Sequence, residues 1–161
     1  MSVIAPFVNR VLAPPRIRPQ TTAPADEAGP NDSAEPSTCI MIVEDDFLIA
    51  MEMEDALTQA GFEVILACSG EEALAIAGER NPALTIMDIR LPGALDGVDA
   101  ALALFQNHRL RSIFSTAHSD PDTRARAAPA QPAGWLVKPY TMPSLVSAVR
   151  AALDAHNLPR S

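Results

Sequence analysis

The sequence lacks most of the features that mark membrane and secreted proteins. Its 161 residues include only two cysteines, too few for a disulfide framework, and no Cys/His spacing typical of a zinc site. Cys39 and Cys68 are expected to be ordinary buried residues. The apolar runs 39–43 and 64–68 are far shorter than the roughly 20 residues of a membrane helix, and the N-terminus carries no pattern of a secretory signal. We therefore expect a cytoplasmic protein without a membrane partner.

Positive charge is also scarce, with twelve basic residues against twenty acidic ones. The resulting net charge of −8 repels phosphate backbones and anionic lipid, so nucleic-acid binding is disfavoured. The sequence does contain 48% hydrophobic residues, a normal share for a globular protein. Its length suits one domain with an appendage.

The appendage is the N-terminal segment 1–37. It holds seven of the fifteen prolines and has no periodic apolar pattern over most of its length, so we expect it to be mostly disordered. In segment 3–12, apolar residues recur at a spacing of four. That segment is either a helix that docks on a partner or part of a fluctuating or non-native extension. A domain is predicted at 38–157, followed by a short tail at 158–161.

Within the domain, short apolar runs alternate with helical patterns, which is typical of an α/β fold with a parallel sheet. Helix starts are marked by Ser69 with Glu72, by Asp120 before Pro121, and by Pro143. The strands are mostly continuous apolar runs, as expected when helices cover both faces of the sheet. The five predicted strands are 39–44, 63–67, 83–88, 112–116 and 134–137.

Polar residues end four of these strands, where an open parallel sheet binds its ligands. In a flavodoxin-like doubly wound sheet of order 2-1-3-4-5, Asp45, Asp46 and Asp88 would converge, with Thr116 and Lys138 closing the crevice. Carboxylates so close together repel unless they share a cation or a proton. Oxygen ligands without a nearby His or Cys favour Mg²⁺, or the related Mn²⁺.

A carboxylate beside such a metal and a lysine suits phosphoryl transfer. Asp88 is the natural nucleophile, and the turn after it offers the backbone carbonyl of Arg90 to the metal. The Thr116 hydroxyl and the Lys138 ammonium would each bind a phosphoryl oxygen.

These segments resemble the receiver domain of bacterial two-component response regulators over about residues 38–157. IMIVEDDF resembles the family's acidic strand end, with the pair assigned to Asp45 and Asp46, and TIMDIRLPG resembles the phosphoacceptor strand around Asp88. STA at 115–117 is similar to the switch-hydroxyl segment, and GWLVKPY at 134–140 to the lysine-proline segment. Four such motifs in the right order form a specific set.

The resemblance implies a switch rather than an enzyme in the usual sense. Asp88 would accept a phosphoryl group from a phosphohistidine of a sensor histidine kinase or phosphotransfer protein, docked at the first helix. It also implies a cis peptide between Lys138 and Pro139 and an aromatic switch at Trp135. Since the sequence ends soon after the last helix, the expected output is a downstream protein target. The expected state is a monomer or a phosphorylation-dependent homodimer.

Several alternatives remain open at this point. Asp46 is also placed to cap the helix that follows it, and Glu44 is expected to stand beside the metal site or in solvent. A haloacid-dehalogenase-like phosphatase would need a second Asp at the position of Arg90. A flavin carrier would need a Gly/Ser/Thr-rich loop after the first strand. The remaining rival is a receiver-like binding module that is never phosphorylated.

Overall fold

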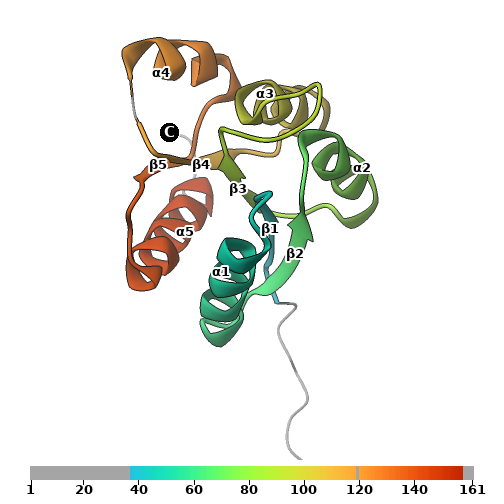
Figure 1. Cartoon of the computed structure of the whole chain (residues 1–161). Coiled ribbons are helices and arrows are strands. Elements are labelled where there is room, and N and C mark those ends of the chain that lie inside the picture. The colour runs from blue at the N-terminus through green and yellow to red at the C-terminus, as the bar shows by residue number, and fades with distance from the viewer. Residues whose placement is uncertain (1–36, 119, 158–161) are drawn as a thin grey trace, which may run out of the picture. The chain divides into compact units, whose positions relative to one another are not determined.

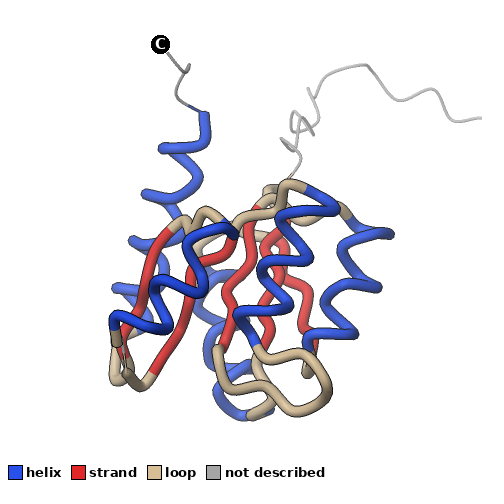
Figure 2. The backbone as a smooth tube through the Cα atoms, turned by 90° about the horizontal axis from the view of Figure 1, so that it is seen from above, coloured by secondary structure: helices blue, strands red, loops and turns tan. Residues whose placement is uncertain are grey.

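A computed structural model describes residues 37–118 and 120–157. The predictions for the N-terminal segment and for 158–161 therefore fall almost wholly outside the described residues. Five parallel strands form one sheet of order β2-β1-β3-β4-β5, with helices on both of its faces (Figures 1 and 2). This is the flavodoxin-like order, and the predicted fold class is confirmed.

The strands lie where the apolar runs predict them. They are β1 (Cys39–Val43), β2 (Glu63–Ala67), β3 (Leu84–Asp88), β4 (Ser112–Thr116) and β5 (Gly134–Val137). Two predicted strands each extend one residue too far, because Glu44 already turns out of β1 and Ala83 precedes β3. Every residue of β3 and β4 is buried, the polar Thr85 and Ser112 included, because helices cover both faces of the sheet here.

The helices begin at side chains that accept hydrogen bonds from their first turns. They are α1 (Phe47–Gln59), α2 (Gly70–Arg80), α3 (Gly97–His108), α4 (Pro121–Ala127) with a 3₁₀ turn at Ala128–Ala130, and α5 (Met142–Asn157). Ser69 Oγ accepts from the Glu72 N–H, and Asp120 caps α4 ahead of Pro121, as predicted. The carboxylate of Glu72 accepts from the Cys68 N–H one residue before the cap.

Two apolar cores fill the space between the sheet and its helices. One face of the sheet packs on α1 and α5 through residues such as Leu57 and Leu145, and the other packs on α2, α3 and α4 through residues such as Leu104 and Phe114 (Figure 1). The strand ends that carry polar side chains therefore lie between two close-packed helix layers. Among the described residues, no helix combines the length and apolar character needed to cross a membrane.

The two cysteines lie at opposite ends of the β1–β2 pair. Cys39 pairs with Glu63 at the start of both strands, whereas Cys68 follows Ala67 at the far end, so both thiols are free. The expectation that both are buried is wrong: Cys39 is half-buried, and Cys68 is exposed because it follows the last residue of an edge strand.

Candidate phosphoacceptor site

The candidate side chains lie together at the carboxyl ends of four neighbouring strands, β1, β3, β4 and β5. Val43 of β1 lies beside Met87 of β3, and Asp88 ends β3 beside Ser115 of β4. Thr116 then pairs with Val137, the residue before Lys138. The convergence predicted from the strand order is therefore present in the backbone register.

Three carboxylates meet at these strand ends, from Glu44, Asp45 and Asp88. One oxygen of each lies within 4.8 Å of the others, and among the described residues this is the group suited to holding a metal ion. Glu44 is 5% exposed and Asp88 8% exposed, whereas Asp45 faces solvent. An open group of hard oxygen ligands with one solvent-facing member fits a divalent ion such as Mg²⁺.

The cluster is electrostatically unfavourable in the absence of a cation. Burial raises the pKa of Glu44, and the charge of Asp88 raises it further. Burial also raises the pKa of Asp88, while the Lys138 ammonium and the Arg90 N–H oppose that rise. Both shifts mean that the site holds its negative charge against a desolvation penalty, which a bound cation would relieve.

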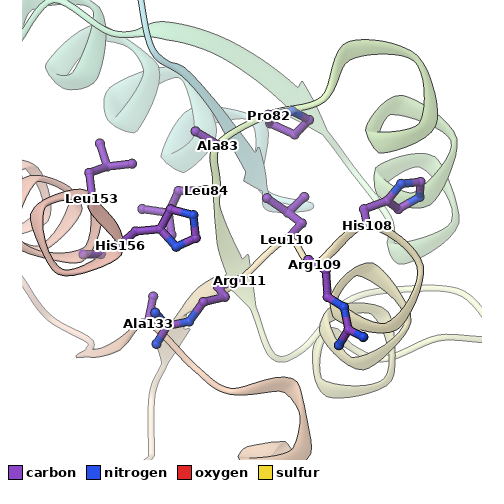
Figure 3. A pocket seen from close by; sticks show the side chains of 11 residues that line it. Pro82, Ala83, Leu84, His108, Arg109, Leu110, Arg111, Ala133, Leu153 and His156 are labelled. Atoms are coloured by element: carbon purple, nitrogen blue, oxygen red, sulfur yellow. The ribbon is translucent and has the colours of Figure 1, made fainter. Parts of the chain in front are cut away.

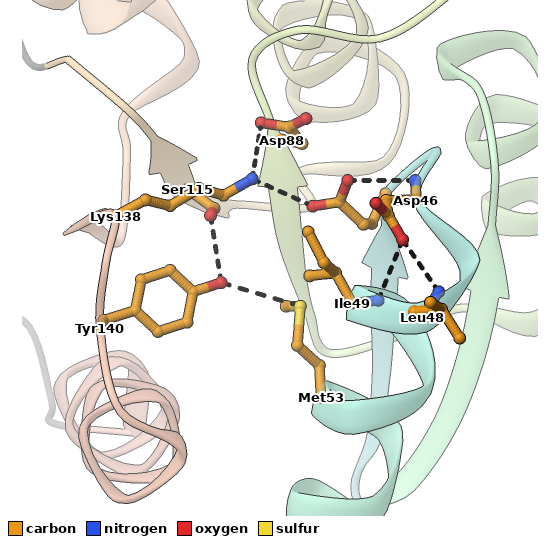
Figure 4. Close-up of polar contacts among 9 residues, drawn as sticks. Asp46, Leu48, Ile49, Met53, Asp88, Ser115, Lys138 and Tyr140 are labelled. Carbon is orange, nitrogen blue, oxygen red and sulfur yellow. Dashed lines mark hydrogen bonds and ion pairs between the residues drawn. The ribbon is translucent and has the colours of Figure 1, made fainter.

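Asp46 and Glu44 lie differently relative to the carboxylate cluster. Asp46 Oδ1 accepts hydrogen bonds from Leu48 N and Ile49 N at 3.0 and 3.3 Å, so its side chain caps α1 and is not one of the three clustered carboxylates (Figure 4). Glu44 points inward instead, and its Oε1 accepts from the Asp46 N–H at 3.2 Å. Of the two places expected for Glu44, solvent is excluded by its burial, and its carboxylate lies in the cluster beside Asp45 and Asp88.

Lys138 reaches the cluster from the end of β5. Its Nζ lies 3.2 Å from Glu44 Oε2 and 3.5 Å from Asp88 Oδ1 (Figure 4). Burial acts to lower the pKa of Lys138, but the carboxylates of Asp88 and Glu44 outweigh it and raise that pKa. The ammonium is therefore charged at neutral pH. The peptide between Lys138 and Pro139 is cis, as the resemblance implied.

Thr116 lines the same cavity but engages its own turn. Its Oγ1 donates to the His118 carbonyl at 2.5 Å and accepts from the His118 N–H at 3.1 Å. A cavity of about 170 Å³ opens between Asp88, Arg90, Thr116, His118 and Lys138. The Thr116 hydroxyl therefore lines the cavity next to Asp88, while both of its hydrogen bonds are to the backbone of His118.

Trp135 packs under α4. Its ring stacks on Phe114 with centroids 4.8 Å apart, and the Arg124 guanidinium lies 4.6 Å from its centroid. These contacts place the indole between a fully buried strand residue and α4. Its role as a switch stays a prediction.

Sequence reasoning missed the contacts of Tyr140. Its hydroxyl shares a hydrogen bond of 3.1 Å with Ser115 Oγ and donates to Met53 Sδ at 3.7 Å (Figure 4). The segment after Lys138 is thereby fastened to β4 and α1. The position of Tyr140 two residues after Lys138 was the available signal, but its partners lie 25 and 87 residues away.

Replacing Tyr140 by phenylalanine should lower the free energy of unfolding by about 1 kcal/mol, because the buried Ser115 hydroxyl loses its partner. Urea unfolding of Tyr140→Phe, Ser115→Ala and the double variant measures the effect. The double variant should be no less stable than Tyr140→Phe alone. Strictly additive losses would show that the two hydroxyls do not interact.

A second cavity, of about 240 Å³, lies at the opposite, amino-terminal ends of the strands (Figure 3). Its lining includes Leu84 at the start of β3, Leu110 before β4, and His108 and His156 near the ends of their helices. His156 stands in the last turn of α5. None of the acidic strand-end residues lines this cavity.

Comparison with known proteins agrees with this geometry. Residues 40–150 match the response regulator receiver domain. The chain is 34% identical over 134 residues to the transcriptional regulatory protein PdtaR of Mycobacterium tuberculosis, covering 83% of this chain and 63% of PdtaR. It is 37% identical over 126 residues to the phyllosphere-induced regulator PhyR of Methylorubrum extorquens, covering 77% of this chain and 46% of PhyR.

Among solved structures, the N-terminal domain of a response regulator/sensory box/GGDEF 3-domain protein from Carboxydothermus hydrogenoformans is similar. It has a TM-score of 0.68 and 34% identity, covering 73% of this chain and 95% of that one. The chain thus spans less than two thirds of the curated relatives' length but nearly all of a solved receiver domain. With the strand order and the acidic strand edge, these matches show that the chain belongs to the response regulator receiver family of two-component signalling, whose members partner histidine kinases and are signalling switches rather than classical enzymes.

Proposed function

We propose that this chain is a phosphoryl-accepting switch in which Asp88 takes the phosphoryl group from a phosphohistidine of a histidine kinase or phosphotransfer protein. The observation that carries the proposal is the environment of Asp88. Its carboxylate ends the central strand beside two other carboxylates and 3.5 Å from the Lys138 ammonium, facing an open cavity of about 170 Å³.

The divalent ion would be Mg²⁺ or Mn²⁺, held by carboxylates of the cluster together with the Arg90 backbone carbonyl. Asp45 and Asp88 are the proposed direct ligands, and Glu44 supplies further negative charge beside them. Asp46 is not proposed as a ligand, because its side chain caps α1. When bound, the ion neutralises charge on the phosphoryl oxygens.

In the transfer step, an Asp88 carboxylate oxygen attacks phosphorus in line with the phosphorus–nitrogen bond. That bond breaks with its electron pair on the imidazole, which leaves as a neutral ring when its other nitrogen carries the proton. Lys138 moves its ammonium from the Asp88 and Glu44 oxygens to a phosphoryl oxygen. Hydrolysis later regenerates the free Asp88 carboxylate. Arg90 and His118 line the cavity through which water would reach the phosphoryl group.

The switching step would begin at Thr116. Its hydroxyl can donate to a phosphoryl oxygen only by releasing the His118 carbonyl, so phosphorylation would remove a contact that holds the loop before α4. Trp135, which contacts Arg124 of α4, is placed to follow that movement. The face built by α4, β5 and α5 would carry the signal to a protein target, and Val137 on β5 is 49% exposed there.

The phosphodonor would dock beside the N-terminal end of α1. Phe47 and Leu48 are 67% and 76% exposed, and Met51 lies on the same helix with 45% exposed. Large apolar side chains so exposed favour a protein contact. They directly follow the acidic residues of the site, so a histidine presented by a docked protein would face Asp88.

The proposal is tested by intact-protein mass spectrometry after incubation with Mg²⁺ and acetyl phosphate. We expect a gain of one phosphoryl group, lost with EDTA and absent from Asp88→Asn. Beryllofluoride titration followed by Trp135 fluorescence provides a second readout. If neither an adduct nor a beryllofluoride response is seen, the chain acts as an unphosphorylated binding module instead.

A further inference from the structure

The loop between β3 and α3 is tied down by a side chain from another helix. Glu71, in the first turn of α2, accepts hydrogen bonds through Oε1 from Ala94 N at 2.9 Å and from Leu95 N at 3.2 Å. These backbone groups lie in the segment that leaves Asp88 and carries Arg90. A single carboxylate thus bridges α2 to the middle of the loop.

The loop is shaped around this carboxylate. Gly93 has φ +109°, a conformation that side-chain-bearing residues rarely adopt, and a Cβ there would lie 2.8 Å from Glu71 Oε2. Both carboxylate oxygens therefore lie against the backbone of 93–95. The backbone N–H of Glu71 itself lowers the pKa of this carboxyl most, and the N–H groups of Ala94 and Leu95 lower it further, so the group is ionised at neutral pH and binds as a charge-assisted acceptor.

The two ends of the loop are fixed by other means. The Gly97 N–H donates to the Ile89 carbonyl at 2.9 Å, which closes the loop next to Asp88. Asp96 caps α3 and pairs with Arg126 of α4 at 2.6 Å. Glu71 supplies the contact that holds the segment between these ends, where Ala94 and Leu95 belong to neither a helix nor a strand.

We infer that Glu71 is a positioning residue of the phosphoacceptor site: its carboxylate fixes the β3–α3 loop, which carries the Arg90 carbonyl proposed as a ligand of the metal beside Asp88. The inference rests on the proposed function. The Arg90 carbonyl belongs to an irregular loop, so its position depends on the contacts that order that loop. Residues that orient metal ligands typically change metal affinity by 10- to 100-fold when they are replaced.

The test is a calorimetric Mg²⁺ titration of the full chain carrying Glu71→Ala, Glu71→Gln or Glu71→Asp. Alanine removes the acceptor and should weaken Mg²⁺ binding by about tenfold. Glutamine keeps the reach and an acceptor oxygen but not the charge, and should stay within about threefold of the unaltered chain. Aspartate keeps the charge but is one methylene too short, so it should behave like alanine.

Glu79→Ala is the matched control, because it removes one negative charge from an exposed position on the same helix. Its Mg²⁺ affinity should be unchanged. Amide hydrogen exchange without metal provides an independent readout, since Ala94 and Leu95 should exchange faster in Glu71→Ala and Glu71→Asp than in Glu71→Gln.

The outcomes separate the inference from the proposed function. If the unaltered chain binds no Mg²⁺, the metal site and the inference both fail. If it binds Mg²⁺ and Glu71→Ala binds equally well, only the positioning role is overturned. If affinity follows charge, falling for glutamine and alanine but not for aspartate, Glu71 acts through its field and the inference is again wrong.

Discussion

Replacing Gly97 by alanine should lower the free energy of unfolding by about 3 kcal/mol or more. A Cβ at this position would overlap the backbone carbonyl oxygen of Asp88 and lie 2.8 Å from the Ile89 Cα. These neighbours are backbone atoms of the last residue of the buried central strand and of the residue after it, which cannot turn aside as a side chain can. Relief requires α3 to move away from Asp88, and the same shift displaces the phosphoacceptor carboxylate.

Gly78 offers a matched control of opposite sign. It lies inside α2, and a Cβ there would lie 4.0 Å from His108 Cε1, an ordinary contact distance. Gly78→Ala should therefore stabilise the chain by about 0.5–1 kcal/mol, the usual helix preference of alanine over glycine. Urea unfolding measures both variants, and equal effects of the two would contradict the close packing at Gly97.

The sheet was the most predictable part of the molecule. The strands at 63–67, 112–116 and 134–137 have the bounds read from the sequence. Strands covered on both faces need apolar residues at successive positions, so the signal is local and continuous. Caps such as Ser69 and Asp120 were readable for the same reason, since a cap and the N–H groups it binds lie within three residues.

The acidic end of β1 shows where sequence reasoning is insufficient. Glu44, Asp45 and Asp46 are consecutive, and any two of them can be read as the metal-binding pair. Their roles depend on the turn into α1, where Asp46 adopts an extended conformation and caps the helix, leaving Glu44 to face inward. Had the capping reading of Asp46 been given priority, Glu44 and Asp45 would have been the remaining pair.

Contacts between distant segments carried no sequence signal. Glu71 lies 23 residues from Ala94, and nothing in the spacing predicts that an exposed glutamate holds that loop. The place of Tyr140 two residues after Lys138 likewise does not predict Ser115, 25 residues away, as its partner. Such pairs depend on how the layers pack, which the local pattern does not encode.

Removing the negative charge of Glu44 should change how stability depends on pH and on Mg²⁺. The folded-state pKa values of Glu44 and Asp88 are raised, so the folded state binds protons more tightly than the unfolded chain does. The stability linked to these groups is fully present below their unfolded pKa values. It is lost as pH rises through their higher folded values. At pH 7 without Mg²⁺, Glu44→Gln should therefore be more stable than the unaltered chain by about 1 kcal/mol.

The advantage of Glu44→Gln should shrink as pH falls from 7 toward the ordinary carboxyl range, because Glu44 then becomes protonated in the unaltered chain. Carboxylates with lowered pKa values, such as Asp96 and Asp120, have the opposite pH dependence, but they are common to both proteins and cancel in the difference. Chemical unfolding at several pH values measures that difference. Glu52→Gln, at an exposed position of α1, is the control for removing a charge without removing the repulsion.

Mg²⁺ should reverse the order of stability. A ligand that binds only the folded state adds about 2.7 kcal/mol when its concentration is one hundred times its dissociation constant. The unaltered chain should gain this increment, whereas Glu44→Gln, with less negative charge at the cluster, should bind Mg²⁺ more weakly and gain less. Equal Mg²⁺ stabilisation of the two proteins would show that Glu44 is no part of the cation site. A stability difference that does not vary with pH would show that folding does not raise the pKa of Glu44. The negative charge that destabilises the metal-free fold by repulsion is therefore the same charge that attracts the cation to Asp88.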